Sequence, residues 1–320
     1  MLYYNITLEI AMRHLPVLFS AALMMASTAT AAPRVVASVV PIHSIVAAVM
    51  GDKGSPELLL KGSMSEHRAV FTPDQIATLG TADLVFIVGH GLEAKLAQIS
   101  GSEAVNGKTF IQLSDAPGII KLPVREGGAW EPDDDEPAPA AGSEAEGVLA
   151  FDPHIWLDPE NAKAMAREVA VDLGKADPEN AAAYAANALA FAAETDKTSA
   201  AIAAELAPDK DKPFIVFHDA YHYFEKRFGL TGVGSISDVS AQAPSAERLG
   251  QVRDKIIAAR ATCVFREPQF DDKFVQAVIE GTGAREGVLD PLGAGLTPGP
   301  KAYDQLIGNL AESLKGCLGG

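Results

Sequence analysis

Three histidines and one aspartate stand at positions where metal-binding side chains are often found. His218 and Asp290 each follow directly on a short apolar run that resembles a β-strand. His67 follows another apolar run and a loop rich in Gly and Ser, and His154 lies within the segment 152–158. Ligands of open α/β sheets bind beyond the carboxyl ends of the strands, and imidazole together with carboxylate suits four-coordinate zinc. These residues are far apart in the sequence, so their spacing alone does not establish a site.

A second arrangement of histidines invites comparison with zinc hydrolases. His218 and His222 are separated by three residues that begin with Asp219, which resembles the H-E-x-x-H motif. The Asp side chain is shorter than the Glu that acts as general base in that motif, and the predicted helix begins only near Asp219. The sequence also lacks G-x-S-x-G, Walker A, G-x-G-x-x-G and C-x-x-C patterns. A catalytic site is therefore not expected, and an exported zinc hydrolase is kept as the alternative from another class.

The elements that must position these residues form two similar series of strands and helices. Continuous apolar runs such as DLVFIV are typical of strands that are buried on both faces of a parallel sheet. The expected strands are Arg34–Val39, Glu57–Leu60, Asp83–Val88, Thr109–Leu113, Phe214–Phe217, Val233–Ile236, Thr262–Arg266 and Gly287–Leu289. The expected helices are Ile42–Met50, Pro73–Thr81, Leu92–Ile99, Tyr221–Phe228, Ser245–Arg260, Asp271–Gly281 and Lys301–Lys315. This alternation predicts an α/β fold with two lobes, each a parallel sheet flanked by helices.

Between the two series lie an acidic segment and an Ala-rich segment. Residues 125–147 are rich in Asp, Glu, Pro, Gly and Ala, so we expect a loop there rather than part of the core. Residues 178–206 predict a single helix about 42 Å long, which is long enough to connect two lobes. The expected organisation is an N-terminal lobe over 32–177, a linker helix over 178–206 and a C-terminal lobe over 207–320.

The N-terminus has the order of regions found in a secretory signal. A basic stretch that begins at Met12 precedes an apolar run and then small residues, with cleavage expected after Ala31. The apolar run is shorter than the roughly 20 residues that span a membrane. We therefore expect residues 1–31 to be removed on export, with Met12 as an alternative start to Met1. No Cys lies near the cleavage site, which argues against a lipid anchor.

Charge and cysteine content narrow the class of protein further. The 320-residue chain carries a formal net charge of −16, which argues against a nucleic-acid binder because such proteins need a basic surface. Its two cysteines, Cys263 and Cys317, both lie in the expected mature protein. An even pair in an exported protein favours one disulfide, and two buried free thiols are the alternative.

Several segments together resemble the zinc-binding solute-binding proteins of ABC importers, the family called cluster A-I or cluster 9. The matching pieces are VVASVVPIHSIVAAVMG, LLLKGSMSEHRAVFTPDQIATLGTADLVFIVGHGLEAKL, FDPHIWLDPENA, FIVFHDAYHYFEKRFGL, ARATCVFREPQFDDK and LDPLG. In this order they extend over about residues 33–318, which is nearly the whole expected mature chain. The resemblance implies two α/β lobes joined by one long rigid helix, with the metal between the lobes.

The resemblance also implies a set of metal ligands. His67, His154 and His218 match the family's three histidine ligands, and a histidine at the third position favours zinc because manganese-type relatives usually have Glu there. Asp290 matches the aspartate that many members use as fourth ligand, and Glu66 matches a glutamate that some use instead. We expect Asp290, because it gives each lobe two ligands, whereas Glu66 adjoins His67 and requires a sharp turn of the backbone. Zinc-type members often carry a His-rich acidic loop, but the acidic segment here contains no histidine.

A carrier function follows from the resemblance. It implies a periplasmic zinc-binding protein that performs no chemistry and delivers Zn²⁺ to an ABC permease with its cytoplasmic ATPase, and we expect a monomer. It also implies the disulfide Cys263–Cys317, which occurs in some zinc-type members. A manganese or iron carrier of the same transporter class is the alternative. A metal-dependent surface adhesin is a third interpretation, which the absence of a lipid-anchor Cys disfavours.

Overall fold

The computed structural model describes residues 32–62, 64–125, 129–130 and 149–320. The predicted signal peptide, its cleavage position and most of the acidic segment lie outside the described residues. Ala32–Gly320 form one compact unit. Among the helices that the structure describes, none combines the length and the apolar character that a membrane span requires.

Two parallel four-stranded sheets with the same pattern of strand order form the framework. The first has the order β2-β1-β3-β4 and the second β6-β5-β7-β8, and every pairing is parallel. Their strands are β1 (Val35–Ala37), β2 (Glu57–Leu58), β3 (Leu84–Ile87), β4 (Thr109–Gln112), β5 (Phe214–His218), β6 (Gly232–Ser237), β7 (Cys263–Arg266) and β8 (Arg285–Val288). The predicted α/β class with two parallel sheets is confirmed. We call the first sheet with its helices the N-terminal lobe and the second the C-terminal lobe.

Helices cover both faces of each sheet because successive strand residues point to opposite sides. In β3, Phe86 faces the core beneath α1 and α4, while Val85 and Ile87 pack with residues of α2 and α3. In the C-terminal lobe, Ile215 packs with α7 and α8, and Phe214 belongs to the core shared with α9. The helices are α1 (Val40–Met50), α2 (Pro73–Thr81), α3 (Ala94–Ser100), α4 (Pro159–Ala176), α6 (His222–Phe228), α7 (Ala246–Ala259), α8 (Lys273–Ile279) and α9 (Ala302–Leu318).

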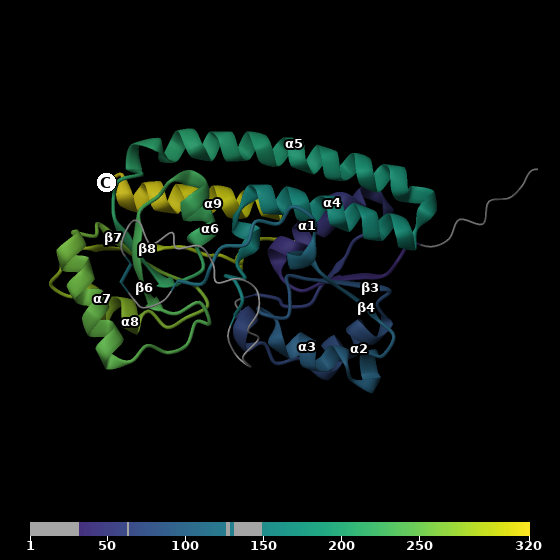
Figure 1. Ribbon diagram of the computed structural model, residues 1–320, viewed down its shortest axis with the longest axis horizontal. Helices are drawn as coiled ribbons and strands as arrows, with labels where there is room; N and C mark the ends of the chain where they lie inside the picture. The colour runs from purple at the N-terminus through teal and green to yellow at the C-terminus, as the bar shows by residue number, and fades with distance from the viewer. Residues whose placement is uncertain (1–31, 63, 126–128, 131–148) are drawn as a thin grey trace, which may run out of the picture. The chain divides into compact units, whose positions relative to one another are not determined.

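One long helix runs from the N-terminal to the C-terminal lobe. The 3₁₀ turn Pro178–Asn180 leads into α5 (Ala181–Leu206), whose 26 residues extend for about 39 Å. Figure 1 shows α5 lying along the side of the molecule that also carries α4, α1 and α9, and it packs against all three. Tyr184, Ala188 and Phe191 follow one another at helical spacing along α5, and all three are buried. Because the core beneath α5 is continuous across both lobes, the helix is a packed element and not an isolated strut.

Helix α4 is an element that we did not predict. Asp158 caps its N-terminus by accepting a hydrogen bond from the backbone N–H of Glu160, and Pro159 occupies the first helical position. The same combination of cap and proline marks α2 at Thr72, where the prediction of the helix is confirmed. The cap signal at Asp158 was therefore present in the sequence.

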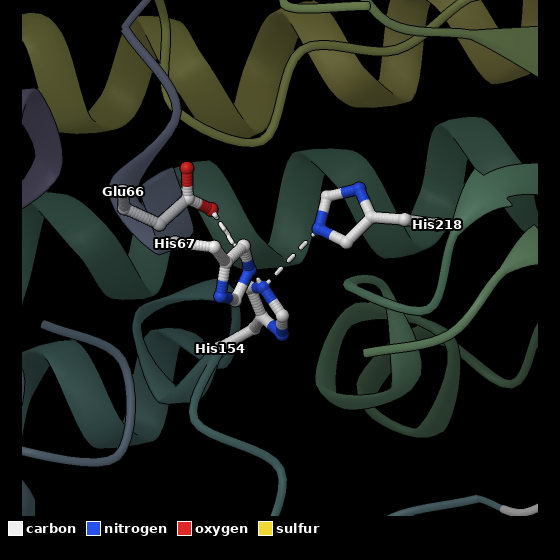
Figure 2. A group of neighbouring side chains, drawn as sticks. All are labelled: Glu66, His67, His154 and His218. Atoms are coloured by element: carbon white, nitrogen blue, oxygen red, sulfur yellow. Dashed lines mark hydrogen bonds and ion pairs between the residues drawn. The ribbon is translucent and has the colours of Figure 1, made fainter. Parts of the chain in front are cut away.

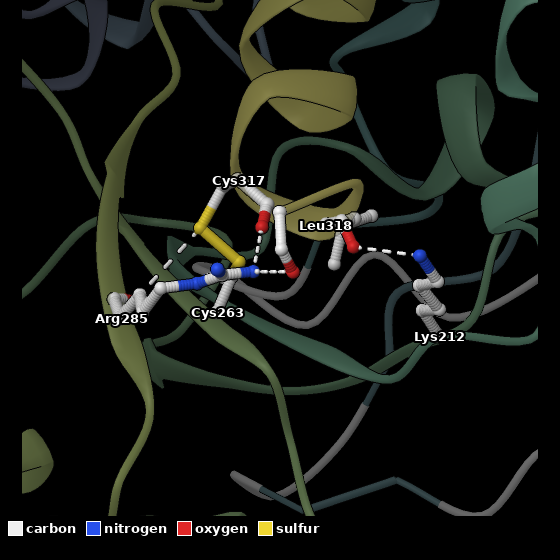
Figure 3. Close-up of a disulfide and its surroundings, with 6 residues drawn as sticks. Lys212, Cys263, Arg285, Cys317 and Leu318 are labelled. Carbon is white, nitrogen blue, oxygen red and sulfur yellow. Dashed lines mark hydrogen bonds between the residues drawn. A yellow bond between two sulfur atoms is a disulfide. The ribbon is translucent and has the colours of Figure 1, made fainter.

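The expected disulfide Cys263–Cys317 is present and joins β7 to the last turn of α9 (Figure 3). Among the described residues there is no free cysteine. The guanidinium of Arg285, on the neighbouring strand β8, donates hydrogen bonds to the backbone oxygens of Cys317 and Gly320. These contacts fix the C-terminus to the edge of the C-terminal sheet.

The beginning of the acidic segment is anchored on the C-terminal lobe. Arg125 forms ion pairs with Asp219 and Glu225, and its guanidinium lies 3.6 Å from the centre of the Trp130 ring. The backbone N–H of Trp130 donates to the carbonyl of Val233 in β6 at 3.0 Å. The described part of this segment is thus held by charge, by an aromatic contact and by a backbone hydrogen bond, which the composition of the segment did not predict.

Candidate metal site

Four side chains from three distant segments meet at the carboxyl ends of the strands. Glu66, His67, His154 and His218 each offer one ligand atom, and these four atoms all lie within 4.8 Å of one another. Figure 2 shows Glu66 and His67 extending from one turn toward His154, with His218 facing them from the C-terminal lobe. Their side chains have exposed fractions of only 0 to 7%. The cluster is therefore shielded from bulk water.

Each residue is placed by an ordinary local structure. His218 is the last residue of β5, and His154 stands immediately before the 3₁₀ turn Ile155–Leu157. Glu66 and His67 belong to the 3₁₀ turn Glu66–Arg68, which follows β2 after a short loop. This turn brings the adjacent side chains of Glu66 and His67 to the same point, which we had considered an obstacle to Glu66 as a ligand.

Two carboxylates orient the imidazole rings from behind. The Nδ1 of His154 lies 2.8 Å from Asp152, and the Nδ1 of His218 lies 2.7 Å from Glu267. A carboxylate accepts hydrogen bonds, so in both rings Nδ1 is the donor, and whenever the ring is neutral its Nε2 keeps a lone pair. Such carboxylate–histidine pairs fix the ring orientation and make the other nitrogen a better metal ligand.

Two of the four inward-facing atoms of the cluster lack hydrogen-bond partners among the described residues, and the other two have only each other. The Nε2 atoms of His154 and His218 face each other at 3.3 Å. Within the part of the chain that the structure describes, buried Oε1 of Glu66 and Nε2 of His67 have no hydrogen-bond partner. Buried polar atoms without partners are costly, and a cation among these four atoms would satisfy all of them at once. The donor set therefore fits a metal ion.

The electrostatics of the cluster agree with its geometry. Burial lowers the pKa of His67 to about 3, so this imidazole is neutral at ordinary pH. Burial by itself lowers the pKa of His154. The negative charges and hydrogen bonds of Asp152 and Glu66 outweigh burial and raise this pKa to about 9. Burial raises the pKa of Glu66, yet the surrounding imidazoles lower it more strongly, to about 2. Glu66 thus brings a permanent negative charge, and in the metal-free protein His154 carries a proton that a metal would replace.

Asp290, the fourth ligand that we expected, is not brought into this cluster. It lies two residues beyond the end of β8, and its carboxylate accepts hydrogen bonds from the backbone N–H groups of Leu292, Gly293 and Ala294. The side chain of Gln269 donates a further hydrogen bond to it at 2.8 Å. Asp290 therefore organises its own loop, and Glu66 supplies the carboxylate of the cluster.

The alternative pair His218 and His222 does not form a hydrolase motif. His218 belongs to strand β5, whereas His222 is the first residue of α6, so the two side chains do not share one helical face. His222 is absent from the group of described residues that could hold a metal. The general-base position of the motif, Asp219, is engaged by Arg125.

Two residues that matter for the site were not predicted from the sequence. Asp152 lies two residues before His154, and Glu267 directly follows β7. Glu267 thus occupies the same kind of strand-end position that singled out His218. The strands β5 and β7 are neighbours in the sheet, so Glu267 stands beside His218. The sequence signal for Glu267 was therefore a carboxylate at the end of a strand, like the signal for His218.

Together, the two parallel lobes, the long helix and the buried cluster of imidazoles and carboxylate define a metal-binding solute-binding protein. The chain matches the sequence model of the family described as ZnuA, zinc-uptake complex component A, periplasmic, over residues 35–317. It belongs to this family.

Individual relatives agree with the family assignment. The chain is 44% identical over 305 residues to the high-affinity zinc uptake system protein ZnuA of Brucella abortus, covering 89% of this chain and 91% of the relative. A crystal structure of ZnuA is similar with a TM-score of 0.74 at 27% identity, covering 90% of this chain and 99% of the other. A ZnuA deletion mutant solved with zinc bound is similar with a TM-score of 0.72, also at 27% identity, covering 90% and 98%.

Proposed function

We propose that this protein binds Zn²⁺ through Glu66, His67, His154 and His218 and delivers it to an ABC permease for uptake. The observation that carries the proposal is the convergence of four ligand atoms within 4.8 Å of one another in a buried site. Zinc is the cargo of this site and is not consumed or changed. Asp290 supports the loop beside the site and is not a ligand in this proposal.

The chemistry of the donors favours zinc over manganese or iron. Three imidazole nitrogens and one carboxylate oxygen form a set of the kind that zinc takes in four-coordinate sites. Manganese prefers more oxygen ligands, and the only carboxylate among the four grouped residues is Glu66. The names of the relatives, which refer to zinc uptake, support the same metal.

The site is proposed to carry a metal without performing a reaction. Catalytic zinc sites have three protein ligands and keep a fourth position for water or substrate, whereas this cluster offers four protein ligands. The imidazole of His154 is fully buried and that of His218 is 1% exposed, so a substrate has no access to the metal. These features support a carrier and weigh against the alternative of a zinc hydrolase.

The cellular setting is part of the proposal. We propose that residues 1–31 direct export and are removed after Ala31, and that the mature chain is a monomer in the periplasm. The permease and its cytoplasmic ATPase are the proposed partners. The net charge of −16 supports the absence of a nucleic-acid partner. Sequencing the N-terminus of the exported protein tests the cleavage position, and its mass in solution tests the monomer.

Metal analysis of the purified mature protein tests the function directly. One tightly bound Zn²⁺ per chain is expected, and a competition titration should show zinc displacing manganese. The matched variant His218→Glu replaces one nitrogen donor by oxygen at the third ligand position and should shift the preference toward manganese. Equal affinity of the unaltered protein for the two metals would contradict zinc as the cargo.

A further inference from the structure

The turn that carries two of the proposed ligands makes a hydrogen bond to the opposite lobe. Arg68 directly follows His67, and its Nη2 donates a hydrogen bond of 2.6 Å to the backbone carbonyl of Ala241. Ala241 lies in the loop after β6 of the C-terminal lobe, whereas Glu66–Arg68 belongs to the N-terminal lobe. The contact therefore joins the first ligand turn to the lobe that provides His218.

The carbonyl that accepts this hydrogen bond is held in an unusual backbone conformation. Ala241 has φ of 54°, in the left-handed region that residues other than Gly rarely adopt, and it is 2% exposed. Asp238 supports this conformation, because its backbone carbonyl accepts from the N–H of Ala241 and its side chain accepts from the N–H of Ser240. The hydroxyl of Ser237 donates to the carbonyl of Gln242. Backbone strain that its surroundings maintain in this way often marks a functional position.

The ligand turn itself has little local structure to hold it. It is a 3₁₀ turn of three residues, and the hydrogen bonds of such short turns have poor geometry. Inside the turn, the N–H of Arg68 reaches the carbonyl of Ser65 at 3.3 Å. The position of Glu66 and His67 therefore depends on tertiary contacts, and the bond to Ala241 is one that can break without disturbing a core.

We propose that Arg68 is a positioning residue that holds the Glu66–His67 turn against Ala241 and thereby slows the release of zinc. The inference rests on the proposed zinc site. When the hydrogen bond opens, the turn can move away from His154 and His218 and carry two ligands with it. The lobes themselves stay together, because buried contacts elsewhere join them. Examples are the bond from Trp156 to the carbonyl of Pro291 and the bond from Tyr303 to the carbonyl of Trp156.

A purely electrostatic role of Arg68 would have the opposite sign. Its guanidinium is a positive charge beside the site, so removing it by itself makes the binding of a dication more favourable. The proposed positioning role predicts instead that removing Arg68 speeds zinc release. The direction of the change therefore separates the two roles.

Zinc dissociation from the mature protein into excess chelator, followed by stopped flow, tests the proposal. Arg68→Met keeps the apolar stem but loses the donor and the charge, and we expect about tenfold faster release, which corresponds to about 1.4 kcal/mol. Arg68→Lys keeps the charge without the planar fork and should release zinc at an intermediate rate. Lys61→Met is the matched control, since it removes an exposed positive charge from the same connection and should change release less than about twofold.

The association rate and the melting temperature of the metal-free protein complete the test. Both should change little in Arg68→Met, because the fold does not depend on this exposed side chain. If Arg68→Met released zinc as slowly as the unaltered protein, or more slowly, the proposed role of Arg68 would be overturned, and the proposed zinc site would stand. Failure of the unaltered protein to hold zinc would instead overturn the proposed function and this inference together.

Discussion

The Nε2 atoms of His154 and His218 face each other at 3.3 Å, although 64 residues separate the two histidines in the sequence. Both rings have their Nδ1 atoms bound to carboxylates, so in the neutral state each presents a lone pair to the other. In the metal-free protein a proton on His154 relieves this repulsion; burial disfavours that proton, but Asp152 and Glu66 outweigh burial and raise the pKa of His154 to about 9. A zinc ion placed among the same atoms would relieve it more completely, and it would link the two lobes.

Replacing each of the two candidate carboxylates by its amide shows which of them is the fourth zinc ligand. Glu66→Gln should weaken zinc binding by more than about 100-fold, because loss of a ligand costs more than the 10- to 100-fold typical of a supporting group. Asp290→Asn should change zinc affinity much less but lower the free energy of unfolding by about 1–3 kcal/mol, since its carboxylate accepts three backbone hydrogen bonds. Chelator competition and denaturant unfolding measure the two effects. A larger loss of affinity in Asp290→Asn would return the role to Asp290.

The two carboxylates that accept hydrogen bonds from the ligand histidines should increase the affinity for zinc without contacting the metal. Asp152→Asn and Glu267→Gln each replace a carboxylate that accepts from an imidazole by an amide of the same shape. We expect each change to reduce zinc affinity by about 10- to 100-fold, because the orientation and the basicity of the ring are no longer fixed. Isothermal titration with chelator-buffered zinc gives the affinities. Wild-type affinity in both variants would show that these pairs only stabilise the fold.

Zinc affinity should fall as the pH is lowered from about 9. The pKa of His154 in the metal-free protein is raised to about 9, so below this pH a proton must leave before zinc can bind. Glu66, with its pKa lowered to about 2, stays ionised throughout and contributes no pH dependence. Affinity should therefore decrease about tenfold per pH unit below this value, with about one proton released per zinc. Equal affinities at about pH 6 and about pH 8 would contradict the assignment of His154.

Deleting residues 131–146 should leave tight zinc binding intact. All four proposed ligands lie outside the deleted stretch, and so do Arg125 and Trp130, which attach the segment to the C-terminal lobe. The deletion removes negative charge, so it should slow zinc association at low ionic strength more than at high ionic strength. Equilibrium competition and stopped-flow association at two salt concentrations measure these effects. Loss of the tight site on deletion would show that the proposed set of ligands is incomplete.

Removing the disulfide should destabilise the chain without changing its affinity for zinc. Cys263 and Cys317 are 54 residues apart, and closing a loop of this length stabilises by about 4 kcal/mol through the entropy of the unfolded chain. The double variant Cys263→Ala, Cys317→Ala should therefore unfold at lower denaturant concentration. Thiol titration of the denatured, unreduced protein should detect no free thiol. Two free thiols in that assay would contradict the bond shown in Figure 3.

Much of the framework could be predicted from the sequence, because its signals are local. The continuous apolar run at β3 and the Thr72 cap before α2 depend on neighbouring residues only, and both elements lie where we predicted them. The strand-end rule also selected His218, and the family resemblance implied His67 and His154 beside it; the structure brings these three histidines together. Helix α4 was missed although Asp158 and Pro159 provide the same kind of local signal.

The fourth member of the cluster was decided only by the tertiary structure. From the sequence we expected Asp290, because it would give each lobe two ligands, and we kept Glu66 as the alternative. The 3₁₀ turn directs Glu66 inward, whereas the backbone N–H groups after Asp290 occupy its oxygens. The pairing of His218 with Glu267 likewise depends on β5 and β7 being neighbours. Sequence patterns report which residues can ligate a metal, but competition among hydrogen-bond partners from distant segments determines which of them are free to do so.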